Sequence, residues 1–267
     1  MSSVAYAVSD GLTITKRNLL KIKRVPDLIV FAILSPIMFV LLFVYVFGAA
    51  IPLDGISYAE FLLPGIFAQT IIFGASFSGL SLAEDLQKGL IDRFRSLPMA
   101  RSAVLVGRTV ADIFINVISV VVMSITGLIV GWRITSSVGE AILGYVLLLL
   151  FGFAISWLMA VFGMLVRTPE AFNNASFIVI FPLTFIANTF VPTQGFPAVL
   201  KAIADWNPIS SLVQATRNLF GNTAPGLPVP DVWSLQNPVT YTLIWLVGFL
   251  LVFIPLAVRV YLKTSTR

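Results

Sequence analysis

The sequence predicts an all-α integral membrane protein. Of its 267 residues, 58% are hydrophobic and 11% are charged, and the mean hydropathy is +0.98. A soluble domain typically carries about 25% charged residues. The apolar residues gather in six runs, each close to the ~20 residues that a helix needs to cross a bilayer. We expect one membrane domain, 1–267, with an interfacial segment at 1–27, six spans within 28–258 and a tail at 259–267.

Composition argues against several kinds of site. The chain has no cysteine for disulfides or thiolate metal sites, and no histidine, the commonest metal ligand and general base. We expect no catalytic site and no metal site. The net charge of +5 could suggest nucleic acid as a partner, but the bases are sorted along the chain rather than gathered in one patch. No nucleic-acid partner is expected.

The first predicted element is a helix lying on the membrane surface. Apolar residues such as Leu12 and Leu19 are interleaved with bases before the first long apolar run. A basic amphipathic helix binds an anionic leaflet. The alternative is a simple orientation signal with no further role. The bases concerned are Lys16, Arg17, Lys21, Lys23 and Arg24.

Six spans follow, at 28–47, 61–82, 104–130, 141–166, 171–191 and 239–258. Pro36 and Pro182 lie inside the first and fifth spans, and we expect a bend in the first. Arg108 and Asp112 are four residues apart near the start of the third span, so they share a helix face and can pair. Between the last two spans lies a loop rich in proline and glycine. Its two apolar pieces, 198–204 and 209–220, are predicted to be short helices that lie flat or dip into the outer leaflet.

A charged link joins the second and third spans. Residues 83–95 contain no proline and one glycine, and Leu86, Leu90, Ile91 and Phe94 recur at helical spacing. We expect one helix here, ended by Pro98. Two interpretations are open. The link is either a solvated amphipathic connector or a coupling element that inserts into a groove on a partner.

The bases also predict orientation. Fourteen of the 17 lie in the N-terminal segment, the charged link, the turn after the fourth span and the tail. These segments share one side of the membrane if there are six spans. The other side has Arg133, Lys201 and Arg217. Because basic residues favour cytoplasmic segments, both termini and the link are expected in the cytoplasm, with the chain in the plasma membrane.

The missing motifs narrow the choice of energy source. No glycine-rich phosphate loop occurs, so any ATP and Mg²⁺ must be bound by another chain. No acid or base is clearly placed at mid-membrane, where ion-coupled carriers usually hold one. An enzyme is also disfavoured, because no set of catalytic side chains is evident in the spans.

A specific pattern runs through the link. Glu84 stands at the end of the second span, Gly89 follows, and Gly107 with Arg108 opens the third span. The set resembles the permease subunits of ABC-2 type exporters, in the daunorubicin/doxorubicin-resistance branch. The resemblance extends from about residue 15 to 261. The link motif is completed by Asp92, Arg93, Phe94, Arg95 and Pro98, and the Asn207-Pro208 pair and Arg217 match in the outer loop.

The resemblance implies that transport and ATP hydrolysis are carried out by separate chains. Two permease chains, expected to be identical, pair in the membrane, and each binds a separate ATP-binding subunit through the link and the N-terminal helix. The substrate would be an amphipathic, often cationic drug, an antibiotic or a lipid. ATPase coupling would fall to Glu84, Lys88, Gly89, Asp92, Arg93, Phe94, Arg95 and Pro98, and the outer gate to Asn207, Pro208 and Arg217.

Plainer roles compete with these assignments. Glu84 and Asp112 can simply form ion pairs with neighbouring bases. Asn116, Asn173 and Asn174 are candidates for the substrate path, but they can equally make hydrogen bonds between helices. At the level of the whole chain, the alternatives are an ATPase-independent carrier or channel, a lipid or glycolipid exporter subunit, and a structural membrane protein.

Overall fold

The computed structural model describes residues 3–24, 26–48, 50–51, 53, 55–95, 103–223 and 229–263. These residues form helices and connecting segments and contain no strand, which confirms the all-α class. A π-helical turn, Phe43–Phe47, extends α2, and a short 3-10 turn, Thr193–Gly195, precedes α8. The α-helices are α1 (Ser3–Arg24), α2 (Pro26–Leu42), α3 (Tyr58–Gln87), α4 (Leu90–Arg95), α5 (Ala103–Ile129), α6 (Val138–Leu165), α7 (Pro169–Ile186), α8 (Ala198–Trp206), α9 (Pro208–Phe220), α10 (Trp233–Gln236) and α11 (Pro238–Lys263).

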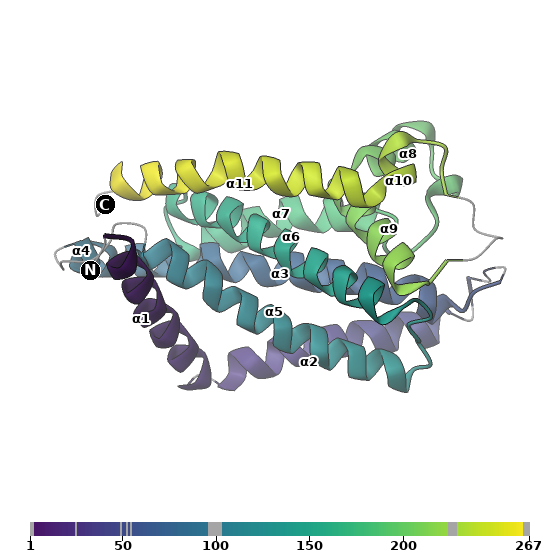
Figure 1. Cartoon of the computed structure of the whole chain (residues 1–267), viewed down its shortest axis with the longest axis horizontal. Helices are drawn as coiled ribbons and strands as arrows, with labels where there is room; N and C mark the ends of the chain where they lie inside the picture. The colour runs from purple at the N-terminus through teal and green to yellow at the C-terminus, as the bar shows by residue number, and fades with distance from the viewer. Residues whose placement is uncertain are drawn as a thin grey trace.

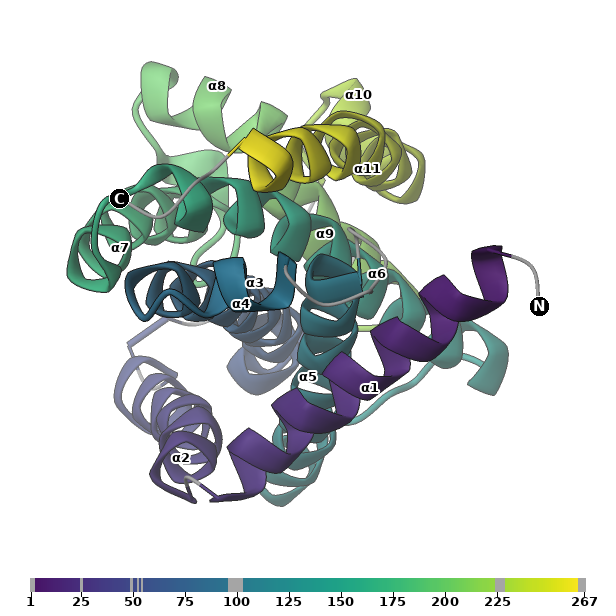
Figure 2. The same cartoon turned by 90° about the vertical axis from the view of Figure 1, so that its left-hand side faces the viewer.

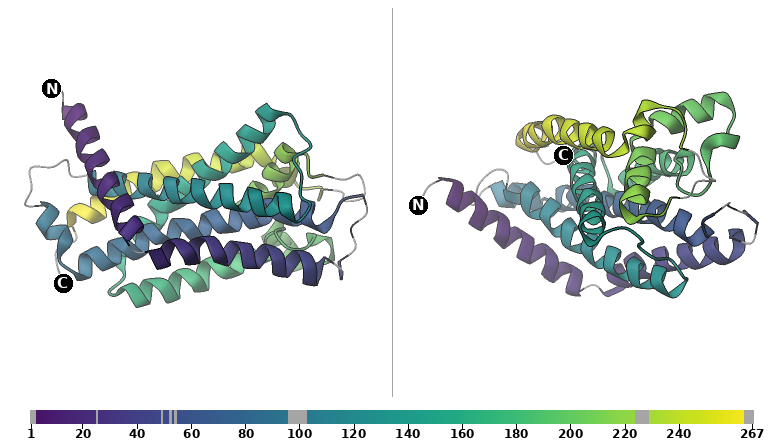
Figure 3. Two further views of the ribbon diagram at one scale, coloured as in Figure 1. Left: turned by 90° about the horizontal axis from the view of Figure 1, so that it is seen from below. Right: turned by 45° about the vertical axis from the view of Figure 1, so that its right-hand side comes forward.

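The long helices run along one axis of an elongated bundle (Figure 1). One end, which we call the link end, contains α4, the beginning of α1 and the last turn of α11. At the other, the loop end, α8, α9 and α10 gather. Figure 3 shows α1 crossing the bundle obliquely rather than running parallel to it. The start of α1 and the end of α11 therefore share one end of the molecule, as an even number of crossings requires.

Within the described residues, four helices are long and apolar enough to cross a bilayer: α3, α5, α6 and α11. They correspond to the predicted second, third, fourth and sixth spans. The first predicted span falls on α2 and its π-helical turn, and the fifth on α7, which has 18 residues and ends at Ile186 rather than 191. The count of six spans stays a prediction. The two apolar pieces of the long loop form short helices, as expected, in α8 and α9.

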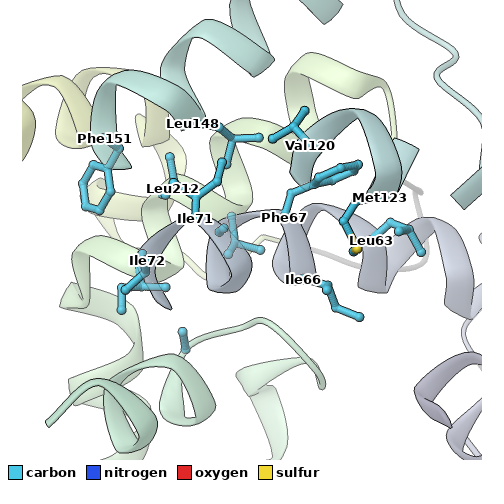
Figure 4. Close-up of a cluster of buried hydrophobic side chains, with 14 of the residues drawn as sticks. Leu63, Ile66, Phe67, Ile71, Ile72, Val120, Met123, Leu148, Phe151 and Leu212 are labelled. Atoms are coloured by element: carbon cyan, nitrogen blue, oxygen red, sulfur yellow. The ribbon is translucent and has the colours of Figure 1, made fainter. Parts of the chain in front are cut away.

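The helix α3 forms the centre of the bundle. In its most apolar stretch 72% is buried inside the molecule, compared with 11% for α11. Side chains from α5, α6 and α9 pack around its apolar residues to form the main core (Figure 4). The outer helices instead turn apolar side chains such as Ile129 and Leu251 outward. An apolar outer surface is what a bilayer-embedded bundle presents to lipid.

Two glycines allow α3 and α6 to approach closely. A methyl group added at Gly163 would collide with the Gly79 backbone, and one at Gly79 with the Met159 carbonyl and the Phe172 ring. Small residues at such crossings allow backbone contact between membrane helices.

The helix α3 begins at a capping box, in which the Ser57 hydroxyl accepts a hydrogen bond from the Glu60 amide at 3.2 Å.

The prediction of a single link helix over 83–95 is wrong, because the structure divides this stretch between two helices. The helix α3 continues without interruption through Gln87, and a separate short helix, α4, begins at Leu90. The break is at Gly89, whose φ of 67° is left-handed and is strained for residues with a side chain. The Gly89 amide donates to the Leu86 carbonyl at 3.0 Å and closes the helix end. Pro98, predicted to end the link helix, lies outside the described residues.

Candidate functional site

The link end is organised by the crossing of α1 over α5 (Figure 2). The α1 residues Ile14, Thr15 and Asn18 are buried, and the Asn18 carboxamide donates to the Gly107 carbonyl at 3.4 Å. Gly107 has no room for a side chain, because a methyl group there would lie 2.7 Å from Ile14 Cβ. The predicted interfacial helix therefore has a buried face against this chain's own α5. Its opposite side, with Leu12 and Lys16, is exposed.

The helix α1 also touches the charged link. The Arg17 guanidinium lies 4.0 Å from the Asp85 carboxylate of α3 and 4.7 Å from the centre of the Phe94 ring of α4. An arginine placed over an aromatic ring gains a cation–π attraction. One side chain thus connects α1, α3 and α4. We call the surface formed by α1, the last turn of α3 and α4 the coupling face.

The apolar stripe of the link packs inward. Ile91 is buried in a second apolar cluster with Leu82, Leu105 and Trp157, and Leu86 and Phe94 pack against the same cluster. The stripe therefore packs at least in part against this chain's own core. The coupling role of the link, including its insertion into a groove on a partner, stays a prediction. The exposed surface of the link is polar, with Lys88 and Arg93 among its exposed residues.

A buried polar cluster lies just inside the coupling face. Arg108 Nε is 3.9 Å from Asp112 Oδ1, and both side chains are at least nine-tenths buried. The Ser78 hydroxyl of α3 donates to Asp112, while Arg108 donates to the Ser81 hydroxyl and, at 3.0 Å, to the Phe77 carbonyl. Burying this ion pair is favourable only with such additional hydrogen bonds. The cluster therefore ties α5 to α3.

The predicted ion pairs are confirmed in these helices. Asp112 pairs with Arg108, and Glu84 pairs with Lys88 at 3.4 Å. Glu84 is on the exposed side of the last turn of α3, so its pair is solvent-screened and contributes little stability. The side chains of Lys21, Lys23, Arg24, Asp92 and Arg95 lie outside the described residues, so their predicted roles stay predictions.

A cavity of about 560 Å³ lies on the other side of α3, between α2 and α7. Its walls come from α2, α3, α5 and α7. Asn173 and Asn174 are both exposed, but only Asn173 is part of the described lining. Asn116 lies behind the wall, where its carboxamide packs against Gly74 of α3 and Gly152 of α6. Of the three predicted asparagines, the structure therefore places one at the cavity.

At the loop end, Arg217 is buried and holds three segments together. Its guanidinium stacks 3.8 Å from the centre of the Phe61 ring and donates to the Phe61 carbonyl at 2.9 Å and the Asn188 carbonyl at 2.5 Å. Asn207 caps α9 by accepting from the Ile209 amide at 2.9 Å, and Pro208 occupies the first position of that helix. These residues fix the position of α9 beneath the loop. Their predicted role as a gate stays a prediction.

Comparison with known proteins places this geometry in a family. The family model of the ABC-2 type transporter matches residues 11–220, which contain the coupling face, the cavity and α9. The chain belongs to the ABC-2 type transporter family. Membership implies an ABC ATP-binding partner for this membrane subunit.

Individual relatives agree over most of their length. The daunorubicin resistance ABC transporter permease protein DrrB1 of Streptomyces coeruleorubidus is 34% identical over 257 residues, covering 96% of this chain and 87% of that protein. The probable doxorubicin resistance ABC transporter permease protein DrrC of Mycobacterium tuberculosis is 24% identical, covering 97% and 91%. A putative transport permease, ycf38, of Pyropia yezoensis is 28% identical, covering 77% and 72%. The resemblance inferred from the sequence motifs is confirmed.

Some residues of this ABC-2 transporter chain were not singled out from sequence. Gln69 and Ser76 of α3 and Ser119 of α5 line the cavity. Gln69 and Ser76 are seven residues apart in an otherwise apolar span, so they share one helix face. That spacing is a signal that could have found them. The contact of Arg17 with Asp85 has no such signal, because the two residues are distant in sequence.

Proposed function

We propose that this chain is the permease subunit of an ATP-driven exporter of amphipathic drugs or antibiotics, energised by a separate ATP-binding subunit that supplies the ATP and Mg²⁺ sites. The observation that carries the proposal is the coupling face. There a short link helix is held against α1 and α3 by Arg17, with basic side chains exposed at Lys88 and Arg93. A force applied to α4 is transmitted directly to α3, the central helix of the bundle.

The relatives support the substrate class. Two of them are named for resistance to daunorubicin or doxorubicin, which are amphipathic aromatic drugs. The cavity between α2 and α7 suits such a molecule, because it is largely apolar and opens between membrane helices. A lipid or glycolipid is the second substrate class to compare in a transport assay.

The orientation and assembly belong to the same proposal. The coupling face is cytoplasmic, with both termini on that side, because the bases gather there. The loop end, where Asn207, Pro208 and Arg217 fix α9, faces outward and closes the path. Two identical chains pair in the membrane, with one ATP-binding subunit on each. Asn116, Asn173 and Asn174 remain candidates for the path.

The test is association with the ATP-binding subunit. Tagged permease is purified in mild detergent from its own cells, and the co-eluting proteins are identified. The wild-type chain is expected to retain a stoichiometric partner that carries a phosphate-binding loop. Arg93→Glu together with Arg95→Glu is expected to abolish retention while leaving the permease in the membrane, because charge reversal repels a complementary acidic surface.

A matched double reversal at the loop end serves as the control. Arg133→Glu with Lys201→Glu introduces the same change of charge at the loop end, where Arg133 is exposed and Lys201 is partly exposed. This control is expected to retain the partner. Unchanged association of the Arg93 and Arg95 variant would contradict the docking assignment, and loss of the partner in the control would contradict the orientation.

A further inference from the structure

The described lining of the cavity between α2 and α7 contains no charged side chain. We propose that this cavity binds the flat, uncharged aromatic part of the substrate through hydrogen bonds from Gln69, Ser76 and Ser119, and that a row of phenylalanine rings extends from it toward the loop end. This inference rests on the proposed export function and names the chemistry that the site selects. The ligand class is a neutral fused-ring molecule that carries hydroxyl or carbonyl groups.

The polar groups of the cavity are available for a ligand. The side chains of Gln69 and Ser119 are buried, and neither makes a hydrogen bond within the described residues. The Ser76 hydroxyl is buried and also lacks a partner there. Buried polar groups in native proteins normally find partners, and an unpaired group is costly. A ligand with carbonyl and hydroxyl groups would satisfy these three side chains.

The position of the three groups restricts the ligand further. Gln69 and Ser76 come from one face of α3, and Ser119 comes from α5. All three side chains are neutral. A cation buried among them would lose its hydration without gaining a carboxylate, which is strongly unfavourable. Phenylalanine faces attract cations only modestly. Any charged group of an amphipathic substrate is therefore expected to stay outside the cavity, at the headgroups.

Aromatic rings continue from the cavity wall along α7. Phe177, which lines the cavity, is 6.4 Å from Phe73 of α3, measured between ring centres, and 4.9 Å from Phe181. These separations are typical of favourable aromatic pairs, and a planar ligand can stack in a similar offset geometry on the ring faces that line the cavity. The cavity therefore offers ring faces as well as hydrogen bonds.

The row then leaves the cavity toward the loop end. Phe185 follows Phe181 at 4.1 Å, Phe190 follows at 4.6 Å, and the last contact is with Phe43 of the π-helical turn at 4.5 Å. Phe190 is anchored where the Tyr58 hydroxyl donates to its carbonyl at 3.0 Å. Because Tyr58 begins α3 at the loop end, the row joins the cavity to that end of the molecule.

The site is tested by direct binding to the purified full chain in lipid nanodiscs, without the ATP-binding subunit. The probes are 1,8-dihydroxyanthraquinone, which is flat and neutral, and tetraphenylphosphonium, which is a permanent lipophilic cation. Empty nanodiscs supply the lipid background. Saturable binding is expected for the anthraquinone, with no competition from the cation. Gln69→Met with Ser119→Ala is expected to weaken anthraquinone binding by roughly tenfold, because it removes two hydrogen-bonding groups.

A matched control removes the same atom from the same helix. Ser124→Ala alters α5 at a hydroxyl that is not part of the described cavity lining and contacts the Tyr145 hydroxyl at 2.8 Å. It is expected to bind the anthraquinone as the wild type does. Unweakened binding by the Gln69 and Ser119 variant, absence of saturable binding, or equal competition by the cation would each overturn the proposed site.

The aromatic row has its own readout. In proteoliposomes with the ATP-binding subunit, Phe185→Leu is expected to slow export of the anthraquinone several-fold. The affinity for the anthraquinone should stay unchanged, because Phe185 is not among the described lining residues. Unchanged export would overturn the row as part of the path. These results are separable from the proposed function. A chain that retains its ATPase but binds no anthraquinone refutes only the site, whereas one that binds it but has no ATPase refutes only the exporter assignment.

Discussion

The buried Arg108–Asp112 pair shows what a single pair of residues contributes to the bundle. The i, i+4 spacing predicted the pairing from sequence, and the structure confirms it at 3.9 Å. The sequence did not indicate the serines that complete the cluster. Serine is common in membrane helices and often bonds only its own backbone, as the Ser176 hydroxyl does with the Phe172 carbonyl at 2.7 Å. Which serine faces a charge depends on helix rotation and packing.

Removing one partner of the Arg108–Asp112 pair is expected to destabilise the protein more than replacing both partners. Asp112→Ala leaves the Arg108 charge buried without its carboxylate, which is expected to cost about 3–5 kcal/mol of stability. The midpoint of thermal unfolding in detergent should fall markedly. Replacing both partners, Asp112→Ala with Arg108→Leu, should recover much of the loss, because no unpaired charge remains. Glu170→Ala, at an exposed acid at the start of α7, is the control and should change the midpoint little.

At the scale of elements, the sequence predicted which helices exist, and in what order, better than it predicted the residues at which they begin and end. Long apolar runs gave, within a few residues, the four described helices that are long and apolar enough to cross a bilayer, because crossing a bilayer fixes their length. The link was harder. One glycine in a helical pattern is often tolerated, so only its left-handed backbone in the fold reveals the division between α3 and α4. The burial of Ile91 likewise depends on α5 and α6, which the local pattern does not contain.

The close crossing of α1 over α5 predicts that α1 is loosened when Gly107 is enlarged. Gly107→Ala places a methyl group 2.7 Å from Ile14 Cβ and 2.8 Å from the Gly11 carbonyl oxygen, so α1 must move away. Overpacking of this kind costs about 1–3 kcal/mol. Amide hydrogen exchange in α1 should accelerate, with little change in α11. Gly248→Ala, where nothing lies within 4 Å of the added methyl group, should leave α1 exchange unchanged. Equal exchange in the two variants would contradict the packing described here.

At the scale of the whole molecule, the sequence predicted the membrane class and the family, which are confirmed. The cytoplasmic side of the bases stays a prediction. The cavity could not be predicted, because its lining comes from four helices distant in sequence. Nor could the row of phenylalanines. A chain with 22 phenylalanines in apolar spans gives no indication of which rings face lipid and which face each other. Helix rotation decides this, and it follows from packing of the complete bundle.

The orientation of the whole molecule can be tested with single cysteines, since the chain has none of its own. Gln87→Cys, exposed at the coupling face, is expected to react with a membrane-impermeant maleimide only after the cells are permeabilised. Val138→Cys, exposed at the opposite end of the bundle, should react in intact cells. The cysteine-free parent reports the background. The reverse labelling pattern would invert the topology and separate the coupling face from any cytoplasmic ATPase.

The backbone contact between Gly79 and Gly163 limits which motions are open to the bundle. Helices that touch through their backbones have no side-chain layer to deform, so α3 and α6 are expected to shift as one rigid body. The helices α2 and α7, each containing a proline, lie on either side of the cavity. The helix α7 packs mainly against α3, whereas α2 packs against both α5 and α3. A displacement of the link at Gly89 would then move α3 relative to α2 and α7. Because these three helices line the cavity, its shape would change. Alternating access in this chain would be a relative rotation between a stiff pair and its bent neighbours.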